Sequence, residues 1–351
     1  MTSTQHNSID YLYDLEQFGI KLGLKNIRVL QEALGFPDQS FTSIVVAGTN
    51  GKGSVAAMLD TALRSAGYTT GRFTSPHLVN LRERFCMRGT PVRYDKLVAE
   101  VDHLRATVSQ LLMNGKLPAP PTFFEATTAI ALSLFRNAGV RVAVLEVGMG
   151  GRFDATNVVT PTAVAIPSID LDHQQYLGTT LAEIAFEKAG VIKTGSLVIV
   201  GETQMEAVKV IRQACHERAS RLVETMPQVK TKTGLRNGLT ELEMTTPIRR
   251  YGPIQIGLRG RHQVRNAVVA VRLLEELKDC GLPVSEKAIL EGLVKTRWSG
   301  RLELVSIDTH RSLLFDAAHN VASAAAFAAY VDEVWPNGIP LIFAALEDKD
   351  I

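Results

Sequence analysis

The chain has 351 residues, of which 46% are hydrophobic and 21% are charged, and its formal net charge is +2. That length allows about two domains, and the composition is that of an ordinary globular protein with enough apolar material for a core. The near-neutral charge gives no sign of attraction to a polyanion or a membrane surface, so we expect neither nucleic acid nor a membrane among the partners.

Cysteine usage and the N-terminus indicate where the protein works. The three cysteines, Cys86, Cys215 and Cys280, are few and widely spaced, which argues against a disulfide framework and against a cysteine-based zinc site. Residues 1–10 are polar and lack the apolar core of a signal peptide. No apolar run approaches the ~20 residues that span a bilayer. We therefore expect a cytoplasmic protein in a reducing compartment.

Short apolar runs alternate with helical stretches along the first two thirds of the chain. In chain order, the pattern predicts a strand at 43–47, helices at 54–66 and 123–137, strands at 141–147 and 162–166, a helix at 181–189 and a strand at 197–200. Continuous apolar strands separated by helices are typical of a mostly parallel sheet with helices on both faces. We therefore predict the α/β class, with ligands at the carboxyl ends of the strands.

The remaining third of the chain has a different sequence pattern. Residues 225–260 predict a small β excursion, 264–280 a helix, and 296–300 a glycine-containing linker that follows another short helix. Beyond the linker, the pattern predicts paired strands at 301–307 and 312–315, a helix at 322–334 and a strand at 340–345. We divide the chain into residues 1–296 and a smaller α/β domain, 297–351. About 55 residues is small for such a domain, so we expect it to be truncated.

The strongest local signal is the segment Gly48–Ser54, GTNGKGS, between a predicted strand and a predicted helix. Its glycines allow backbone N–H groups to point inward, and the helix N-terminus favours negative charge, so the segment predicts a phosphate loop. Lys52 would meet the β- and γ-phosphates, and Ser54 could cap the helix or bind magnesium. The segment departs from the Walker A pattern, because Gly53 stands where a serine or threonine belongs. The alternative is a glycine-rich turn with an incidental lysine.

Three further side chains follow predicted strands or end a predicted helix. Glu146 ends the strand 141–147, where an ionised carboxylate is costly unless it binds a metal or pairs with a base such as Arg152. His173 follows the strand 162–166, either as a ligand to a hard cation or its water, or as a structural hydrogen-bond donor. Lys188 lies on a predicted helix, and composition alone predicts a solvated surface lysine.

Taken together, these segments resemble folylpolyglutamate synthase and the bifunctional dihydrofolate synthase/folylpolyglutamate synthase of the Mur ligase superfamily. The matching motifs are VAGTNGKGS (46–54), SPHL (75–78), FEATT (124–128), EVGMGGRFDATN (146–157), LDH (171–173), EKAGVIK (187–193), GRHQVRNA (260–267), WSGRLE (298–303), FDAAHN (315–320) and ALEDKD (345–350). All ten occur in the family order, and the match runs from about Leu22 to Asp350, nearly the whole chain. One departure is Ala317, where the family usually has glycine, which requires a negative φ at this position.

The resemblance implies a Mur-ligase-type, P-loop-containing ATP-binding domain at 1–296 with an N-terminal substrate loop, and a Rossmann-like ligase domain at 297–351. It implies two magnesium ions, the first held by Ser75 and Glu146 and the second by His173. It also implies that Lys188 is carbamylated. The implied ATP site consists of Gly48, Thr49, Asn50, Gly51, Lys52, Gly53, Ser54, Asn266, Arg301, Asp316 and His319. The implied border of the pterin or folate consists of Lys21, Leu22, Gly23, Thr122, Phe123, Phe124, Glu125, Phe153, Asp154 and Ala155.

The function that the resemblance implies is an ATP-dependent amide ligase of folate biosynthesis. It would add L-glutamate to dihydropteroate, to the γ-carboxylate of a (tetrahydro)folate, or to both, through an acyl phosphate. The implied catalytic residues are Lys52, Glu146, His173, carbamylated Lys188 and Arg301. We expect a monomer with small-molecule partners. The alternatives are another Mur-superfamily amino-acid ligase, a regulatory NTPase and a truncated, inactive ATP-binding remnant.

Overall fold

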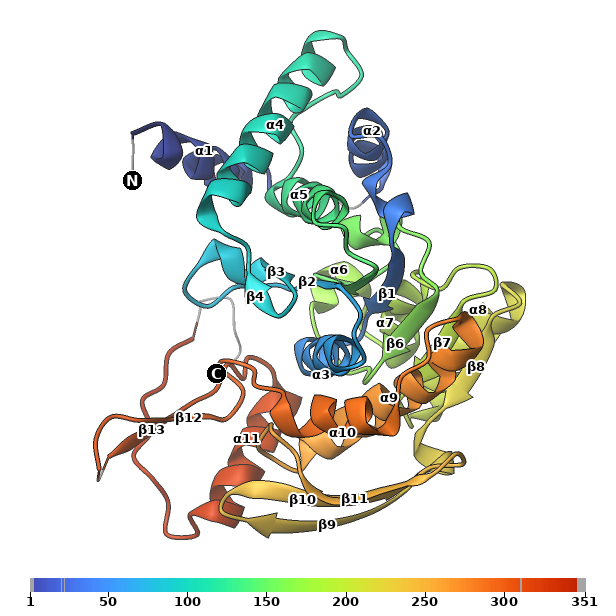
Figure 1. The fold of residues 1–351 in the computed structure, drawn as a ribbon, viewed down its shortest axis with the longest axis vertical. Coiled ribbons are helices and arrows are strands. Elements are labelled where there is room, and N and C mark those ends of the chain that lie inside the picture. Colours follow the sequence, from blue (N-terminus) through green and yellow to red (C-terminus); the bar gives the residue numbers. More distant parts are fainter. Residues whose placement is uncertain (1–2, 20, 22, 310, 346–351) are drawn as a thin grey trace.

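The computed structural model describes residues 3–19, 21, 23–309 and 311–345 (Figure 1). Its centre is an eight-stranded sheet in the order β4-β3-β2-β5-β1-β6-β7-β8. The strands are β1 (Thr42–Val46), β2 (Thr70–Phe73), β3 (Phe85–Met87), β4 (Thr90–Pro91), β5 (Val142–Glu146), β6 (Ala163–Ile166), β7 (Leu197–Val200) and β8 (Arg221–Glu224). The six strands from β2 to β8 in this order are parallel, and β3 and β4 continue the sheet antiparallel. The predicted mostly parallel sheet is confirmed.

Helices cover both faces of this sheet, as predicted (Figure 1). One core contains the inner sides of α1 (Ser3–Asp14), α2 (Lys25–Ala33), α4 (Tyr94–Met113), α5 (Phe123–Asn137), α7 (Leu181–Ala189) and α8 (Met205–Glu217). The other core contains those of α3 (Lys52–Ser65), α9 (His262–Glu276) and α10 (Glu286–Lys295). Side chains of β1 point alternately to the two faces of the sheet, so Val45 packs in the first core and Ile44 and Val46 pack in the second.

The sheet register determines where the site can form. Val46 at the end of β1 pairs with Glu146 at the end of β5 and with Ala165 of β6. The carboxyl ends of three neighbouring strands therefore meet at one edge, where loops can bring their side chains together. The short helix α6 (Gln174–Leu177) follows β6 close to this edge. Among the described residues, short 3₁₀ helices lie at Leu15–Phe18, Pro37–Ser40, Leu81–Arg84, Ala155–Val158, Met226–Gln228 and Leu277–Cys280.

The predicted β excursion is a separate antiparallel sheet of β9 (Lys230–Arg236), β10 (Leu239–Thr245) and β11 (Arg250–Gln255). The described part of the C-terminal region contains a hairpin of β12 (Glu303–Ser306) and β13 (Ser312–Phe315), followed by α11 (Val321–Val334). The strand predicted at 340–345 is wrong, because no strand forms there and its apolar residues Leu341 and Ile342 are exposed. An apolar run becomes a strand only where another strand lies beside it, and among the described residues β12 and β13 pair with each other and with no third strand.

The C-terminal unit contacts the central part at both ends of α11. The guanidinium of Arg261 at the start of α9 pairs with Glu333, and the hydroxyl of Tyr330 donates to the carbonyl oxygen of Gly238 at 2.9 Å. At the other end, Asn320 caps α11 and donates from Nδ2 to Oδ1 of Asn50, 3.1 Å away. This last contact joins the C-terminal unit directly to the segment after β1.

Candidate functional site

The segment between β1 and α3 forms a backbone loop that opens into a cleft. Gly51, which precedes α3, has a φ of +85°, and a Cβ atom there would collide with Oδ1 of Asn266. Only glycine combines that backbone angle with so close a neighbour. The loop is fixed to the segment after β6, because Thr49 Oγ1 donates to the Asp170 carbonyl at 3.1 Å and Asn50 Nδ2 to the Asp170 carboxylate at 3.1 Å.

Lys52 bends back over this loop. Its Nζ atom donates to the carbonyl oxygens of Gly48 at 3.1 Å and Thr49 at 2.9 Å. Burial lowers the pKa of the Lys52 ammonium, and the carboxylates of Glu146 and Asp172 partly oppose that shift. The ammonium group therefore lies at the mouth of the loop with acceptors that a phosphate could replace.

Lys188 approaches the same loop from behind. It lies one helical turn after Ile184 on α7, so the buried stripe of that helix carries it inward, and only 3% of it is exposed. Its Nζ atom donates to the Gly48 carbonyl at 3.0 Å. Burial, followed by repulsion from Lys52, lowers the pKa of Lys188 to about 7. The solvated surface lysine that composition alone predicts is therefore wrong.

Glu146 is a buried carboxylate at the end of β5. Its Oε2 atom accepts the backbone N–H of Ser75 at 3.1 Å, the one hydrogen bond that it receives within the described residues. The alternative ion pair with Arg152 does not form, because Arg152 approaches Glu187, 3.9 Å away. Burial raises the pKa of Glu146, and the nearby Lys52 opposes the shift. Glu146 and Ser75 are therefore neighbours at the edge of the cleft.

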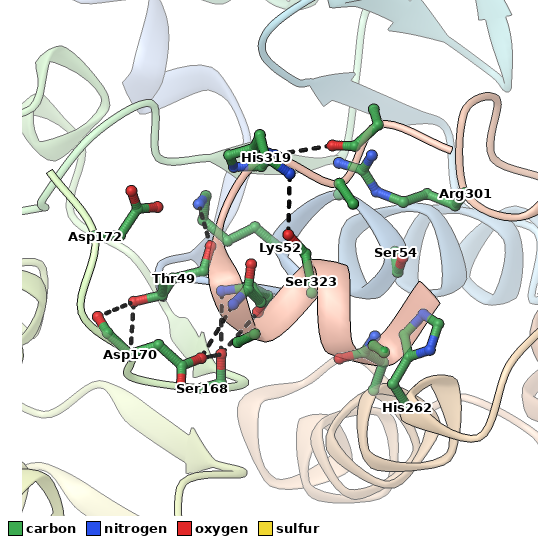
Figure 2. Close-up of a pocket in the computed structure, with 18 of the residues that line it drawn as sticks. Thr49, Lys52, Ser54, Ser168, Asp170, Asp172, His262, Arg301, His319 and Ser323 are labelled. Atoms are coloured by element: carbon green, nitrogen blue, oxygen red, sulfur yellow. Dashed lines mark hydrogen bonds between the residues drawn. The ribbon is translucent and has the colours of Figure 1, made fainter. Parts of the chain in front are cut away.

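A cleft of about 540 Å³ lies between the sheet edge and the C-terminal unit. Figure 2 shows Lys52, Arg301 and His319 approaching it from different elements. The predicted residues that line it are Thr49, Asn50, Gly51, Lys52, Gly53, Ser54, Ser75, Glu146, His173, Asn266, Arg301, Asp316 and His319. Of the predicted ATP residues, only Gly48 lies behind the lining, where both lysines bind its carbonyl oxygen.

His173 occupies the position before α6 with a φ of +49°, and 38% of its side chain is exposed. Its Nε2 atom lies 3.9 Å from a carboxylate oxygen of Asp172. Across the cleft, Asp316 accepts the backbone N–H of Leu302 at 2.8 Å. The Nδ1 atom of His319 is 2.9 Å from the Ala317 carbonyl oxygen, so Nδ1 carries a proton. Ala317, which stands where the family usually has glycine, does not have a positive φ, so an alanine fits the backbone there.

The predicted pterin residues lie outside the cleft lining, and several have structural contacts. Thr122 and Glu125 form a capping box at the start of α5. Buried Asp154 accepts the backbone N–H groups of residues 148, 149 and 156, which fixes the turn after β5. Leu22 lies outside the described residues. Contact with the cleft comes through Gly148, a lining residue packed against the ring of Phe124. The substrate roles of Lys21, Gly23, Phe123, Phe153, Ala155 and the others stay predictions.

Sequence reasoning missed several lining residues. Ser168, Asp170 and Asp172 follow β6, whose position after a buried strand is the signal that could have identified them. Pro76, Gly148, Ala317 and Ala318 were also missed, each beside a predicted residue or motif. Eight more come from the start of α9 and from α11: Arg261, His262, Gln263, Arg265, Ala322, Ser323, Ala326 and Phe327. The four residues at the start of α9 lie in the motif 260–267, which could have identified them. Nothing local marks the residues of α11, because their approach depends on how α11 packs against the central part.

No group of three His, Cys, Asp or Glu side chains gathers as a metal cage in the part of the chain that the structure describes. Magnesium often binds through one or two protein oxygens and completes its shell with water and substrate phosphates. A carboxylate with one hydrogen bond, beside a serine and close to the phosphate loop, fits that mode of binding.

The fold and the cleft define a class of protein: an α/β nucleotide-binding protein in which a second unit lies across a cleft from the glycine-rich loop after β1. Residues 46–274 match the family model of the Mur ligase middle domain. The chain belongs to the folylpolyglutamate synthase family of the Mur ligase superfamily, a family of ATP-dependent ligases.

Three relatives illustrate the similarity. The chain is 35% identical to the dihydrofolate synthase/folylpolyglutamate synthase of Bacillus subtilis, over 99% of this chain and 81% of that protein. It is 36% identical to a probable bifunctional folylpolyglutamate synthase/dihydropteroate synthase of Haloferax volcanii, of which it spans 41%. A crystal structure of Mycobacterium tuberculosis folylpolyglutamate synthase, described as complexed with ADP and AMPPCP, has a TM-score of 0.85 at 32% identity, and the match covers 93% of this chain and 74% of that one.

Within the described residues, no helix combines the length and the apolar character needed to cross a membrane.

Proposed function

We propose that this chain is an ATP- and magnesium-dependent amide ligase that adds L-glutamate to dihydropteroate, to the γ-carboxylate of a (tetrahydro)folate, or to both. One observation carries the proposal: Lys52, Glu146 and Arg301 line one cleft at the carboxyl edge of the sheet. The names of these relatives, dihydrofolate synthase and folylpolyglutamate synthase, support the choice of glutamate and folate substrates. The protein would act as a monomer in the cytoplasm.

ATP would lie in the cleft with its phosphates against the loop. Backbone N–H groups at the start of α3, together with Lys52, would bind the β- and γ-phosphates. Arg301, His319 and Asp316 from the C-terminal unit would bind the nucleotide from the opposite wall, and Asn266 would support the loop. Bound in this way, the γ-phosphate faces a site where cationic side chains can neutralise the charge of phosphoryl transfer.

Magnesium fits the residues at the edge of the cleft. Glu146 and Ser75 would hold one ion, and His173 would hold the second or its water, with Asp172 beside it. When bound, magnesium would supply positive charge near the phosphates, which reduces the negative charge that repels an attacking carboxylate. The role of the chain is to keep Glu146 ionised although burial raises its pKa, and Lys52 contributes the opposing charge.

Lys188 would be carbamylated. A lysine with a pKa of about 7 is partly neutral near neutral pH, and only a neutral amine attacks carbon dioxide. The product is a carbamate, which replaces a buried cation by a carboxylate-like anion behind the loop. A mass increase of one carbon dioxide on Lys188 would support this assignment.

The reaction would proceed in two steps. The substrate carboxylate attacks the γ-phosphorus of ATP, and ADP leaves, which gives an acyl phosphate. The amine of L-glutamate then attacks the acyl carbon, loses a proton and expels inorganic phosphate. The C-terminal unit over the cleft would exclude water, which would otherwise hydrolyse the acyl phosphate.

The test is glutamate-dependent ADP release by the purified chain with ATP and magnesium. We expect ADP and dihydrofolate with dihydropteroate as acceptor, or ADP and a longer glutamyl chain with tetrahydrofolate. Product masses in the two assays decide which acceptor is used. ATP hydrolysis that does not depend on glutamate, or nucleotide binding with no turnover with any pterin or folate, contradicts the proposal.

A further inference from the structure

An indole from the linker between the two units lies on the first turn of α3. A Cβ atom added to Gly53 would be 2.9 Å from Nε1 and 3.0 Å from Cζ2 of Trp298. Such distances are too short for a carbon atom, so the absence of a side chain at Gly53 lets the indole lie against the helix backbone. Trp298 therefore contacts the phosphate-loop helix one residue after Lys52.

A guanidinium covers the same indole. The Cζ atom of Arg72 lies 4.7 Å from the ring centroid of Trp298. This is the geometry of a cation–π contact, which is strongest where water is excluded. Only 12% of the Arg72 side chain is exposed. Its Nε atom is buried without a hydrogen-bond partner in the described residues. The contact with Trp298 is therefore a main interaction of this cation.

Arg72 has two further partners, because its Nη2 atom donates to Sγ of Cys86 at 3.3 Å and its Nη1 atom to a carboxylate on α3. Asp60 is fully buried, and its Oδ2 atom lies 3.3 Å from Arg72 and 3.2 Å from Arg64. Its Oδ1 atom accepts the hydroxyl of Thr70 at 2.5 Å. Because Asp60 and Gly53 both belong to α3, a single rigid helix holds the cation through one residue and the indole through another.

The linker contacts α3 at a second point. The hydroxyl of Thr296 donates to the Gly292 carbonyl oxygen at 2.5 Å and lies 3.4 Å from the carbonyl oxygen of Ala57, one helical turn after Gly53. Two contacts one turn apart set the direction of the linker, and Arg301 enters the cleft three residues after Trp298. Neither Trp298 nor Arg72 lines the cleft itself, so both would act through the linker.

We propose that Trp298, held by Arg72, is a positioning residue that sets where Arg301 meets the nucleotide phosphates. This rests on the proposed function for the role of Arg301. The displacement of such a group by about 1 Å can lower a rate on the order of 100-fold. The Arg72–Trp298 contact therefore controls kcat without touching a substrate.

Fluorescence tests the contact without any turnover. The chain has two tryptophans, Trp298 and Trp335, so Trp335→Phe leaves Trp298 as the single reporter. In that background, titration with magnesium and AMPPCP should change the Trp298 emission with a saturable curve. Adding Arg72→Gln should alter the emission of the free protein and reduce the response to nucleotide. An unchanged emission in both experiments overturns the proposal.

Kinetics test the effect on Arg301. Arg72→Gln should lower kcat about tenfold or more, with the KM for glutamate unchanged. Trp298→Leu should do the same, and Trp298→Phe should retain most of kcat because a ring remains. Arg64→Gln is the matched control, since it removes a cation from the same Asp60 carboxylate without touching Trp298. Circular dichroism confirms that each variant is folded.

The outcomes separate this proposal from the proposed function. Normal kcat in folded Arg72→Gln and Trp298→Leu overturns the positioning role, and so does an equal loss in Arg64→Gln. If the unsubstituted chain shows no glutamate-dependent ADP release, the proposed function fails. A nucleotide response of Trp298 that disappears in Arg72→Gln would still support the coupling between the linker and the phosphate loop.

Discussion

The ammonium group of Lys188 donates to the carbonyl oxygen of Gly48 across 3.0 Å, so a side chain from α7 reaches the back of the phosphate loop. The same oxygen accepts from Lys52 at 3.1 Å. Two cations that share one acceptor in a buried place repel each other, and their mutual repulsion is among the causes that lower the pKa of Lys188 to about 7. This relationship makes the protonation state of Lys188 a property of the fold, which stability measurements can detect.

The first prediction concerns the pH dependence of stability. Lys188 has a pKa near 10.5 when unfolded and about 7 when folded. Between these values the unfolded state binds more protons, so the Lys188 contribution to the free energy of unfolding rises with pH. Lys188→Met lacks the buried ammonium group, so it should be more stable than the unsubstituted chain. This difference in the free energy of unfolding should be greatest at pH 7 or below and vanish near pH 10.5. Urea unfolding in carbonate-free buffer across this window measures the difference, and a constant difference contradicts the buried, uncarbamylated lysine.

The second prediction concerns the buried carboxylate. Glu146→Gln should lower glutamate-dependent ADP release by about 100-fold or more, because the charge that would hold magnesium is lost. Since burial raises the folded pKa of Glu146, its ionisation costs stability as pH rises above 4.5. The variant should therefore unfold at the same or a higher temperature at neutral pH. Magnesium with AMPPCP should raise the melting temperature of the unsubstituted chain more than that of the variant. Turnover at the normal rate would exclude the metal role.

The central sheet could be predicted because its strands are continuous apolar runs that end in polar, glycine-rich segments. That pattern located Glu146 and the phosphate loop, since the carboxyl ends of parallel strands meet at one edge. The helix that carries Lys188 was predicted with the observed bounds, Leu181–Ala189. Its burial was not predictable from composition, because lysine is almost always exposed. The family resemblance, which implies a site role for Lys188, and the spacing of Ile184 and Lys188 on one helical stripe were the two signals against a surface position.

The C-terminal unit was less predictable. The run 340–345 reads as a strand, but strand formation depends on a neighbour that local sequence does not reveal. The contact of Asn320 with Asn50 joins residues 270 positions apart, and no local pattern predicts such a pair. The same is true of Arg72 and Trp298, whose sequence contexts give no sign that they meet. Long-range contacts of this kind come from packing, which a motif search does not represent.

The third prediction separates two roles of Asn320. Its Oδ1 atom caps α11 by accepting the backbone N–H of Ser323 at 2.9 Å, and its Nδ2 atom donates to Asn50 at 3.1 Å. Asn320→Asp keeps the cap but removes the donor and places a charge beside Asp172. We expect weaker nucleotide binding and faster proteolysis between residues 296 and 301, with the helix content unchanged. Asn320→Ala also loses the cap, at a cost of about 1 kcal/mol. Unchanged proteolysis in Asn320→Asp would show that the contact does not hold the two units together.

The last prediction concerns stability far from the cleft. Arg272 on α9 is buried, with 3% of its side chain exposed, and pairs with the carboxylates of Glu275 and Glu276. Glu275 also accepts the hydroxyl of Tyr251 at 3.0 Å, which joins α9 to the three-stranded sheet. Arg272→Leu would leave the Glu275 carboxylate buried without its cation, whereas Glu276 would keep its pair with Arg221. The loss of the cation from one buried carboxylate typically costs about 3–5 kcal/mol. Urea unfolding should show this loss.

Arg221→Leu is the matched control for this effect. Arg221 also pairs with Glu276, whose side chain is 8% exposed, but 49% of the Arg221 side chain is exposed. Water can therefore solvate this guanidinium, and the pair contributes less than one in which both groups are buried. We therefore expect a small change in the free energy of unfolding for this variant. A similar loss in both variants would mean that charge number, rather than burial, decides the stability of α9. Because Arg272 lies outside the cleft lining, the folded fraction of Arg272→Leu should bind AMPPCP with unchanged affinity.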